Sequence, residues 1–106
     1  MVNKELRAAY DNYARECEQE IIFLDNHSYD NSIVGVTEDG RLIYDYDKMI
    51  EEYMADEDCD ELDAIEWLEV NTLRAIPYMG ANAPIIMYNN ENIMNHYASR
   101  LSTRNV

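Results

Sequence analysis

The sequence predicts an α+β domain in which helices cover a small three-stranded, mainly antiparallel sheet, in the order α-β-β-α-α-β-(α). Three observations support this prediction. Apolar residues recur every three or four positions in residues 4–23, two β-rich runs flank a turn at Gly40, and short amphipathic segments follow. The 106 residues, of which 47% are hydrophobic, suffice for a single domain over residues 1–106 with one core.

The first half of the chain is predicted to hold a helix and a hairpin. Residues 4–23 carry a helical apolar stripe, which should end in the turn-rich residues 25–32. Residues 32–37 and 41–46 have the composition of strands, and Gly40 between them can take the positive φ of a tight turn. We therefore expect these two runs to pair as a hairpin.

Two short helices are expected next. Asp47 suits the cap of a helix over residues 48–55, and Asp60 with Asp63 resembles a capping box for a helix that ends near Val70. The side chains expected to face the core are Ile50, Tyr53, Met54, Leu62, Ile65 and either Leu68 or Trp67. Neither helix is long enough to be stable alone, so both must dock on the hairpin.

The C-terminal part of the chain is predicted to complete the sheet. Residues 85–88 form a short apolar run typical of a strand, and a third strand would stabilise the hairpin. Residues 89–101 carry apolar side chains at helical spacing, and residues 102–106 are expected to fray.

Most of the net charge lies in residues 45–69, which hold twelve acidic residues and one base, Lys48. The net charge of this stretch is −11, against −14 for the whole chain. Such a charge opposes direct binding to nucleic acid or to an anionic membrane, and it favours a basic protein partner. The carboxylates expected to face that partner are Glu51, Glu52, Asp56, Glu57, Asp58, Asp60, Glu61, Glu66 and Glu69. Alternatively, they are solvated helix faces that keep the protein soluble.

The acidic stretch does not have the spacing of a calcium-binding loop. If Asp56, Asp58 and Asp60 are the first three ligands, Glu61 stands where the loop needs a glycine. Trp67 then stands where the loop needs a bidentate glutamate. We therefore expect no metal site and no cofactor in this stretch.

No catalytic motif accompanies the charge, so we expect a protein that is not an enzyme and has no catalytic residues. Cys59 lies between two aspartates, which should raise the pKa of its thiol and disfavour a nucleophilic pair with His27 or His96. There is no phosphate-binding loop and no dinucleotide motif. A metal-dependent enzyme that uses His27 with Asp25 and Asp30 remains a minor alternative.

One base outside the acidic stretch has two interpretations. Arg74 lies among apolar residues, and the simpler interpretation is an internal salt bridge or cap with one of the many acids. The functional interpretation is a small-molecule or regulatory binding module with a pocket near Arg74, Tyr78 and Tyr88. In that case the acidic residues serve solubility alone.

The expected compartment is the cytoplasm. The two cysteines, Cys17 and Cys59, are too few and too far apart to indicate a disulfide framework or a metal knuckle. The N-terminal residues lack the apolar core of a signal peptide, and no apolar run approaches the thickness of a bilayer.

Two segments, GVTEDGRLIYDYDKMIEEY and AIEWLEVNTLRAIPYMGANAPIIMY, resemble short proteins found in phages and mobile elements of gut bacteria. The resemblance covers about residues 33–88, is most specific in NTLRAIPYMG followed by APII, and carries over no site residues. It implies an inhibitor that binds host defence or replication machinery, as anti-CRISPR and anti-restriction proteins do. Together with the charge, it leads us to expect a nucleic-acid mimic that binds a basic host protein. A Cas nuclease is the most concrete candidate, and the oligomeric state stays open.

Overall fold

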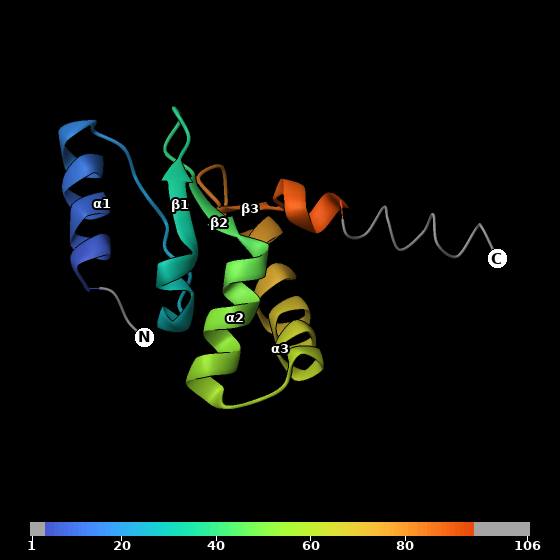
Figure 1. Ribbon diagram of the computed structural model, residues 1–106. Helices are drawn as coiled ribbons and strands as arrows, with labels where there is room; N and C mark the ends of the chain where they lie inside the picture. Colours follow the sequence, from blue (N-terminus) through green and yellow to red (C-terminus); the bar gives the residue numbers. More distant parts are fainter. Residues whose placement is uncertain (1–3, 95–106) are drawn as a thin grey trace.

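The computed structural model describes residues 4–94 and confirms the α+β class with a three-stranded sheet. Helix α1 lies beside β1 at one side of the molecule, and α2 and α3 lie side by side at the other (Figure 1). In chain order the elements are α1 (Lys4–Glu16), η1 (His27–Ser32), β1 (Ile33–Val36), β2 (Leu42–Asp45), α2 (Tyr46–Glu57), α3 (Glu61–Trp67), η2 (Leu68–Leu73), η3 (Ile76–Tyr78) and β3 (Ile85–Met87). Of these, η1 and η3 are 3₁₀-helices and η2 is a π-helix.

The sheet has the order β1-β2-β3 and is mixed. The expected hairpin is present, since β1 and β2 pair antiparallel and Gly40 in the turn has a φ of 87°. The expected third strand is also present, but β3 runs parallel to β2, with Ile43 opposite Ile85. We expected mainly antiparallel pairing. The chain passes through α2, α3, η2 and η3 between the two strands, and a helical crossover of this kind returns it in the parallel direction.

Helix α1 is shorter than the sequence predicts, because it ends at Glu16 and not near residue 23. Glu18 has a φ of 55°, and the chain then runs extended along the hairpin. Hydrogen bonds to distant residues replace the helical ones: the Leu24 amide donates to the Tyr44 hydroxyl at 3.0 Å, and the Gln19 side chain donates to the Glu38 carbonyl at 2.6 Å.

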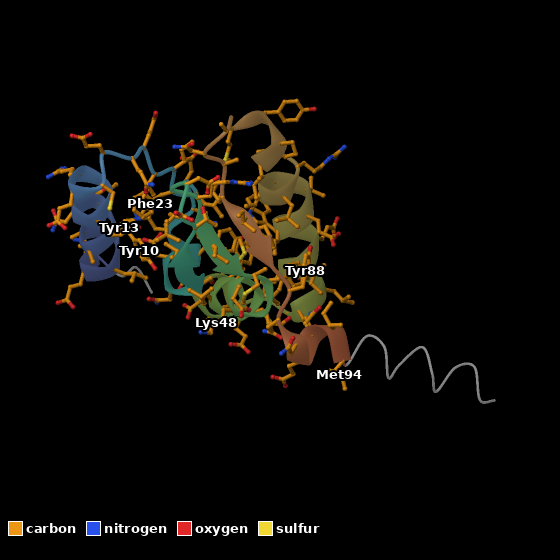
Figure 2. The ribbon with its side chains drawn as sticks, turned by 90° about the horizontal axis from the view of Figure 1, so that it is seen from above. Tyr10, Tyr13, Phe23, Lys48, Tyr88 and Met94 are labelled. Atoms are coloured by element: carbon orange, nitrogen blue, oxygen red, sulfur yellow. The ribbon has the colours of Figure 1, made fainter. Side chains whose placement is uncertain are left out.

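A partly buried ion pair connects α1 to the core. Arg7 Nε donates to Asp30 Oδ2 at 2.7 Å, and Arg7 Nη2 donates to the Leu24 carbonyl at 2.9 Å. Asp30 is fully buried in η1, and the Arg7 guanidinium lies 4.5 Å from the centre of the Phe23 ring. Tyr10 and Phe23 lie between α1 and the rest of the protein (Figure 2).

The core lies between the sheet, η1 and the α2–α3 pair. Its central members are Leu24, Tyr29, Ile33, Leu42, Tyr44, Met49, Ile50, Tyr53, Ala64 and Leu68. Leu42 and Tyr44 point to this core from β2, as the alternating pattern of a strand requires.

The α2–α3 pair is present, with two corrections. The cap of α2 is Asp45 and not Asp47, because Asp45 Oδ1 accepts from the Lys48 amide at 3.1 Å and the helix begins at Tyr46. The expected cap of α3 is confirmed, since Asp60 Oδ1 accepts from the Asp63 amide at 2.9 Å. Leu62, which we expected to be buried, is 77% exposed.

The last described residues fold onto the start of α2. Asn89 Oδ1 accepts from the Asn92 amide at 2.8 Å, and residues 90–94 form helical turns. The rest of the helix expected over residues 89–101, the fraying expected at residues 102–106 and His96 lie outside the described residues. Within residues 4–94, no helix has both the length and the apolar character needed to cross a membrane.

Alkaline pH is expected to destabilise the fold between pH 10 and about 12, because burial raises the pKa of Tyr29 and of Tyr44 from 10.0 to about 12. The native state keeps both phenols protonated after the unfolded chain has ionised, so their full stabilising contribution exists below pH 10 and is lost as the pH rises. Urea unfolding across this range measures the loss. A Tyr44→Phe variant should lose stability less steeply with pH, and equal steepness would contradict the assignment.

Candidate functional site

The predicted partner-binding carboxylates lie on α2, on α3, in the turn between these helices and, for Glu69, in η2. All nine except Glu52 are exposed, and Glu52 is half-buried. Asp58 ends α2 with a φ of 50°, and its amide donates to the Met54 carbonyl, which reverses the chain so that α3 packs against α2. The left-handed conformation of Asp58 at the end of α2 and the Asp60 cap at the start of α3 therefore position the acidic side chains. Glu52 and Asp56 each make an interaction of their own.

Four of the nine predicted carboxylates line two separate grooves, Glu51 and Glu61 the first and Glu57 and Glu66 the second, and the other five line neither. The first, here named the Asp45 groove, has a volume of about 650 Å³. Its polar lining consists of Asp45, Asp47, Lys48, Glu51, Glu61, Asn89, Glu91 and Asn92. Its apolar lining consists of Tyr46, Ile50, Met54 and Ile65. Lys48 and Tyr88 lie on the side of the molecule that carries the last helical turn, marked by Met94 (Figure 2).

Amide side chains hold two carboxylates of the Asp45 groove in place. Asn89 Nδ2 donates to Asp45 Oδ2 at 3.2 Å and to Asp47 Oδ2 at 3.3 Å, and Asn92 Nδ2 donates to Asp47 Oδ1 at 2.9 Å. These donors are neutral, so they orient the two carboxylates without cancelling their charge.

An aromatic pair lies close to carboxylates from three elements. The Tyr46 and Tyr88 rings have centroids 4.9 Å apart. Burial raises the pKa of Tyr46, and Glu69, Tyr88, Asp47 and Glu61 raise it further. Carboxylates from the start of α2, the start of α3 and η2 therefore act on one ring.

The second groove, here named the Trp67 groove, has a volume of about 440 Å³. It is lined by Tyr53, Glu57, Cys59, Asp63, Glu66, Trp67, Val70 and Asn71. Trp67 and Asn71 also line a smaller hollow of about 210 Å³ next to it. The Trp67 ring therefore forms part of the wall between two depressions, and it is 46% exposed.

Three stacked rings connect this groove to the core. The centroids of Tyr29 and Tyr53 are 6.1 Å apart, and those of Tyr53 and Trp67 are 6.0 Å apart with 19° between the planes. Tyr29 and Tyr53 are buried, and Trp67 is the outer member of the stack. Packing on Tyr53 thus fixes the orientation of an exposed indole.

The chemistry of the Trp67 groove disfavours a nucleophilic cysteine. Burial raises the pKa of the Cys59 thiol, and Asp63, Asp60, Glu57 and Asp58 raise it further. The direction is the one expected from its flanking aspartates, although burial is the larger cause. A thiol with a raised pKa is mostly protonated near neutral pH.

The residues considered for a metal do not assemble into a centre. Asp30 is buried and bonded to Arg7, and His27 Nδ1 lies 3.7 Å from the same carboxylate oxygen, Asp30 Oδ2. Asp25 is exposed. Across residues 4–94, no three histidine, cysteine or acidic side chains gather so that they can hold a metal ion.

The residues of the alternative pocket lie at the surface. Arg74 is exposed at the end of η2, and Tyr78 in η3 is 89% exposed. Tyr88 follows β3 and packs on Tyr46. None of the three lines the grooves or the smaller hollow described above.

Sequence reasoning missed Asp63 and the two aromatic residues of the Trp67 groove. Glu66 and Trp67 follow Asp63 by three and four positions, which places both beside Asp63 on a helix surface. That signal was present in the sequence. The exposure of Trp67 could not be predicted from the sequence, because a large apolar residue in an amphipathic helix is expected to be buried.

The fold and the two grooves define a small acidic α+β protein with a carboxylate-rich helical pair. Comparison of the chain with protein-family models, curated proteins and solved structures finds no match in any of the three.

Proposed function

We propose that this protein is a non-enzymatic inhibitor of the phage or mobile-element type that acts in the host cytoplasm. It binds a basic surface of a host protein that processes nucleic acid or defends the cell. A Cas nuclease is the most concrete partner, which makes the protein an inhibitor of the anti-CRISPR class. The resemblance of residues 33–88 to short proteins of phages and mobile elements supports the same class.

One observation carries this proposal: carboxylates line both grooves of the α2–α3 pair, and they are almost unopposed by bases. Lys48 is the one basic side chain among the described residues that line the two grooves. A surface evolved for solubility alone needs no grooves, whereas a binding surface gains contact area and shape from them.

The physical mechanism is mimicry of a phosphate backbone. A nucleic-acid-binding enzyme lines its channel with arginine and lysine, and the carboxylates of this protein can pair with the same side chains. Occupation of the channel then excludes the nucleic acid. Complementary charge also accelerates the encounter, and salt slows it.

Reversal of four groove charges is expected to weaken partner binding by about a hundredfold, because desolvated charge pairs dominate such an interface. The variant changes to lysine Glu51 and Glu61 of the Asp45 groove and Glu57 and Glu66 of the Trp67 groove. The protein is immobilised, its partner is captured from a lysate of the host and then purified, and the affinity is measured at several salt concentrations. Salt should weaken the native complex steeply, and duplex DNA should compete with it.

A second four-site variant controls for net charge. It changes to lysine the exposed residues Glu5, Glu16, Glu20 and Glu38, which lie outside both grooves. Each reversal adds two charges, so both variants move the net charge from −14 to −6. The control should keep its affinity within about fivefold, since distant exposed charges are screened. Equal binding by the two variants would refute the proposal.

A further inference from the structure

The Trp67 groove combines exposed apolar side chains with carboxylates. An indole that is 46% exposed lies beside Val70, which is 51% exposed. Three carboxylates, those of Glu57, Asp63 and Glu66, line the same groove, and none of the described residues that line it is basic. An apolar partner would leave these acids without counter-charges, and a simple cation would not use the ring.

We propose that the Trp67 groove binds an arginine side chain of the basic partner, an inference that rests on the function proposed above. A guanidinium is planar, weakly hydrated and permanently charged, so it can lie on the indole while its N–H groups donate to the surrounding carboxylates. The groove volume of about 440 Å³ accommodates one long side chain with adjacent backbone. Arginine fits this pairing of ring and acid better than lysine, whose compact ammonium is strongly hydrated and cannot stack.

The groove is organised before a partner arrives. Trp67 stacks on Tyr53, which stacks in turn on the buried Tyr29, so the indole loses little freedom on binding. The π-helix η2 begins directly after Trp67 and supplies Val70 and Asn71 to the groove wall. Helical turns of this kind are rare and occur frequently at functional sites.

The test uses the full-length protein with a fluorescently labelled oligoarginine peptide and an oligolysine peptide of equal length. Trp67 is the single tryptophan of the chain, so the tryptophan emission reports on the surroundings of this one side chain. We expect oligoarginine to change the Trp67 emission saturably, with the same Kd as its anisotropy titration, and to bind several times more tightly than oligolysine. Trp67→Ala should weaken oligoarginine binding by about thirtyfold, as for a hot-spot tryptophan.

Further variants separate the contribution of the groove to binding from the effects of net charge and of folding. Tyr78→Ala removes an aromatic side chain that is 89% exposed outside the groove, and it should leave the affinity unchanged. Because Trp67→Ala also removes a stacking partner of Tyr53, a second variant, Glu57→Gln with Glu66→Gln, leaves the rings intact. It should weaken oligoarginine binding about tenfold. The charge-matched control, Glu51→Gln with Glu61→Gln in the Asp45 groove, should change the affinity for oligoarginine by less than about threefold.

The outcomes distinguish this inference from the proposed function. Equal binding of the two peptides with no change in Trp67 emission would overturn the arginine site, while the four-site reversal would still decide whether the acidic pair binds a basic partner. Failure of both peptides to bind would also overturn the arginine site. Loss of oligoarginine binding in the Glu57 and Glu66 variant, with retention in the Glu51 and Glu61 variant, supports it.

Discussion

Replacement of Arg7 by methionine is expected to lower the free energy of unfolding by about 3 kcal/mol, the lower end of the range for breaking a buried ion pair. Asp30 is fully buried, and the Arg7 side chain is 22% exposed. Without the guanidinium, His27, at 3.7 Å, is the one ion-pair partner that residues 4–94 offer to Asp30, and Asp30 Oδ1 has no hydrogen-bond partner among these residues. Urea unfolding followed by circular dichroism measures the loss.

Matched variants identify the cause of that loss. Arg15→Met removes an exposed arginine from the same helix, and it should change the stability by no more than about 0.5 kcal/mol. The double variant Arg7→Met with Asp30→Asn removes the uncompensated buried charge, so it should be more stable than Arg7→Met alone. Equal losses from Arg7→Met and Arg15→Met would show that the ion pair does not hold α1 to the core.

The features that the sequence predicts well are those with local causes. The hairpin depends on Gly40, which takes the expected positive φ, and the start of α3 depends on Asp60, which caps the expected amide. The end of α1 has no such local cause. Leu24 bonds to Tyr44 and the Gln19 side chain bonds to the Glu38 carbonyl, and these partners are nineteen or more positions away. Helical periodicity alone could not reveal that competition.

The acidic surface could be predicted from the sequence only in part. The stretch of carboxylates and its division into two helices follow from composition and capping. The division of this surface into two grooves cannot be predicted in the same way, because it depends on how α3 is rotated about its axis. Leu62, Ile65 and Leu68 suggest one buried stripe, whereas the structure buries Ala64 and Leu68. Alanine is an inconspicuous core residue in a sequence, yet its small side chain lets a helix approach its neighbour closely.

Leu68→Ala is expected to destabilise the protein by about 3 kcal/mol, and Leu62→Ala by no more than about 0.5 kcal/mol. Leu68 is fully buried in the core, so its truncation leaves a cavity, whereas Leu62 is 77% exposed on the same helical segment. The two substitutions are chemically identical, and urea unfolding compares them directly. If Leu62→Ala cost as much as Leu68→Ala, α3 would have a different rotation. Asp63, Glu66 and Trp67 would then point elsewhere, so this pair of variants also tests the geometry on which the Trp67 groove depends.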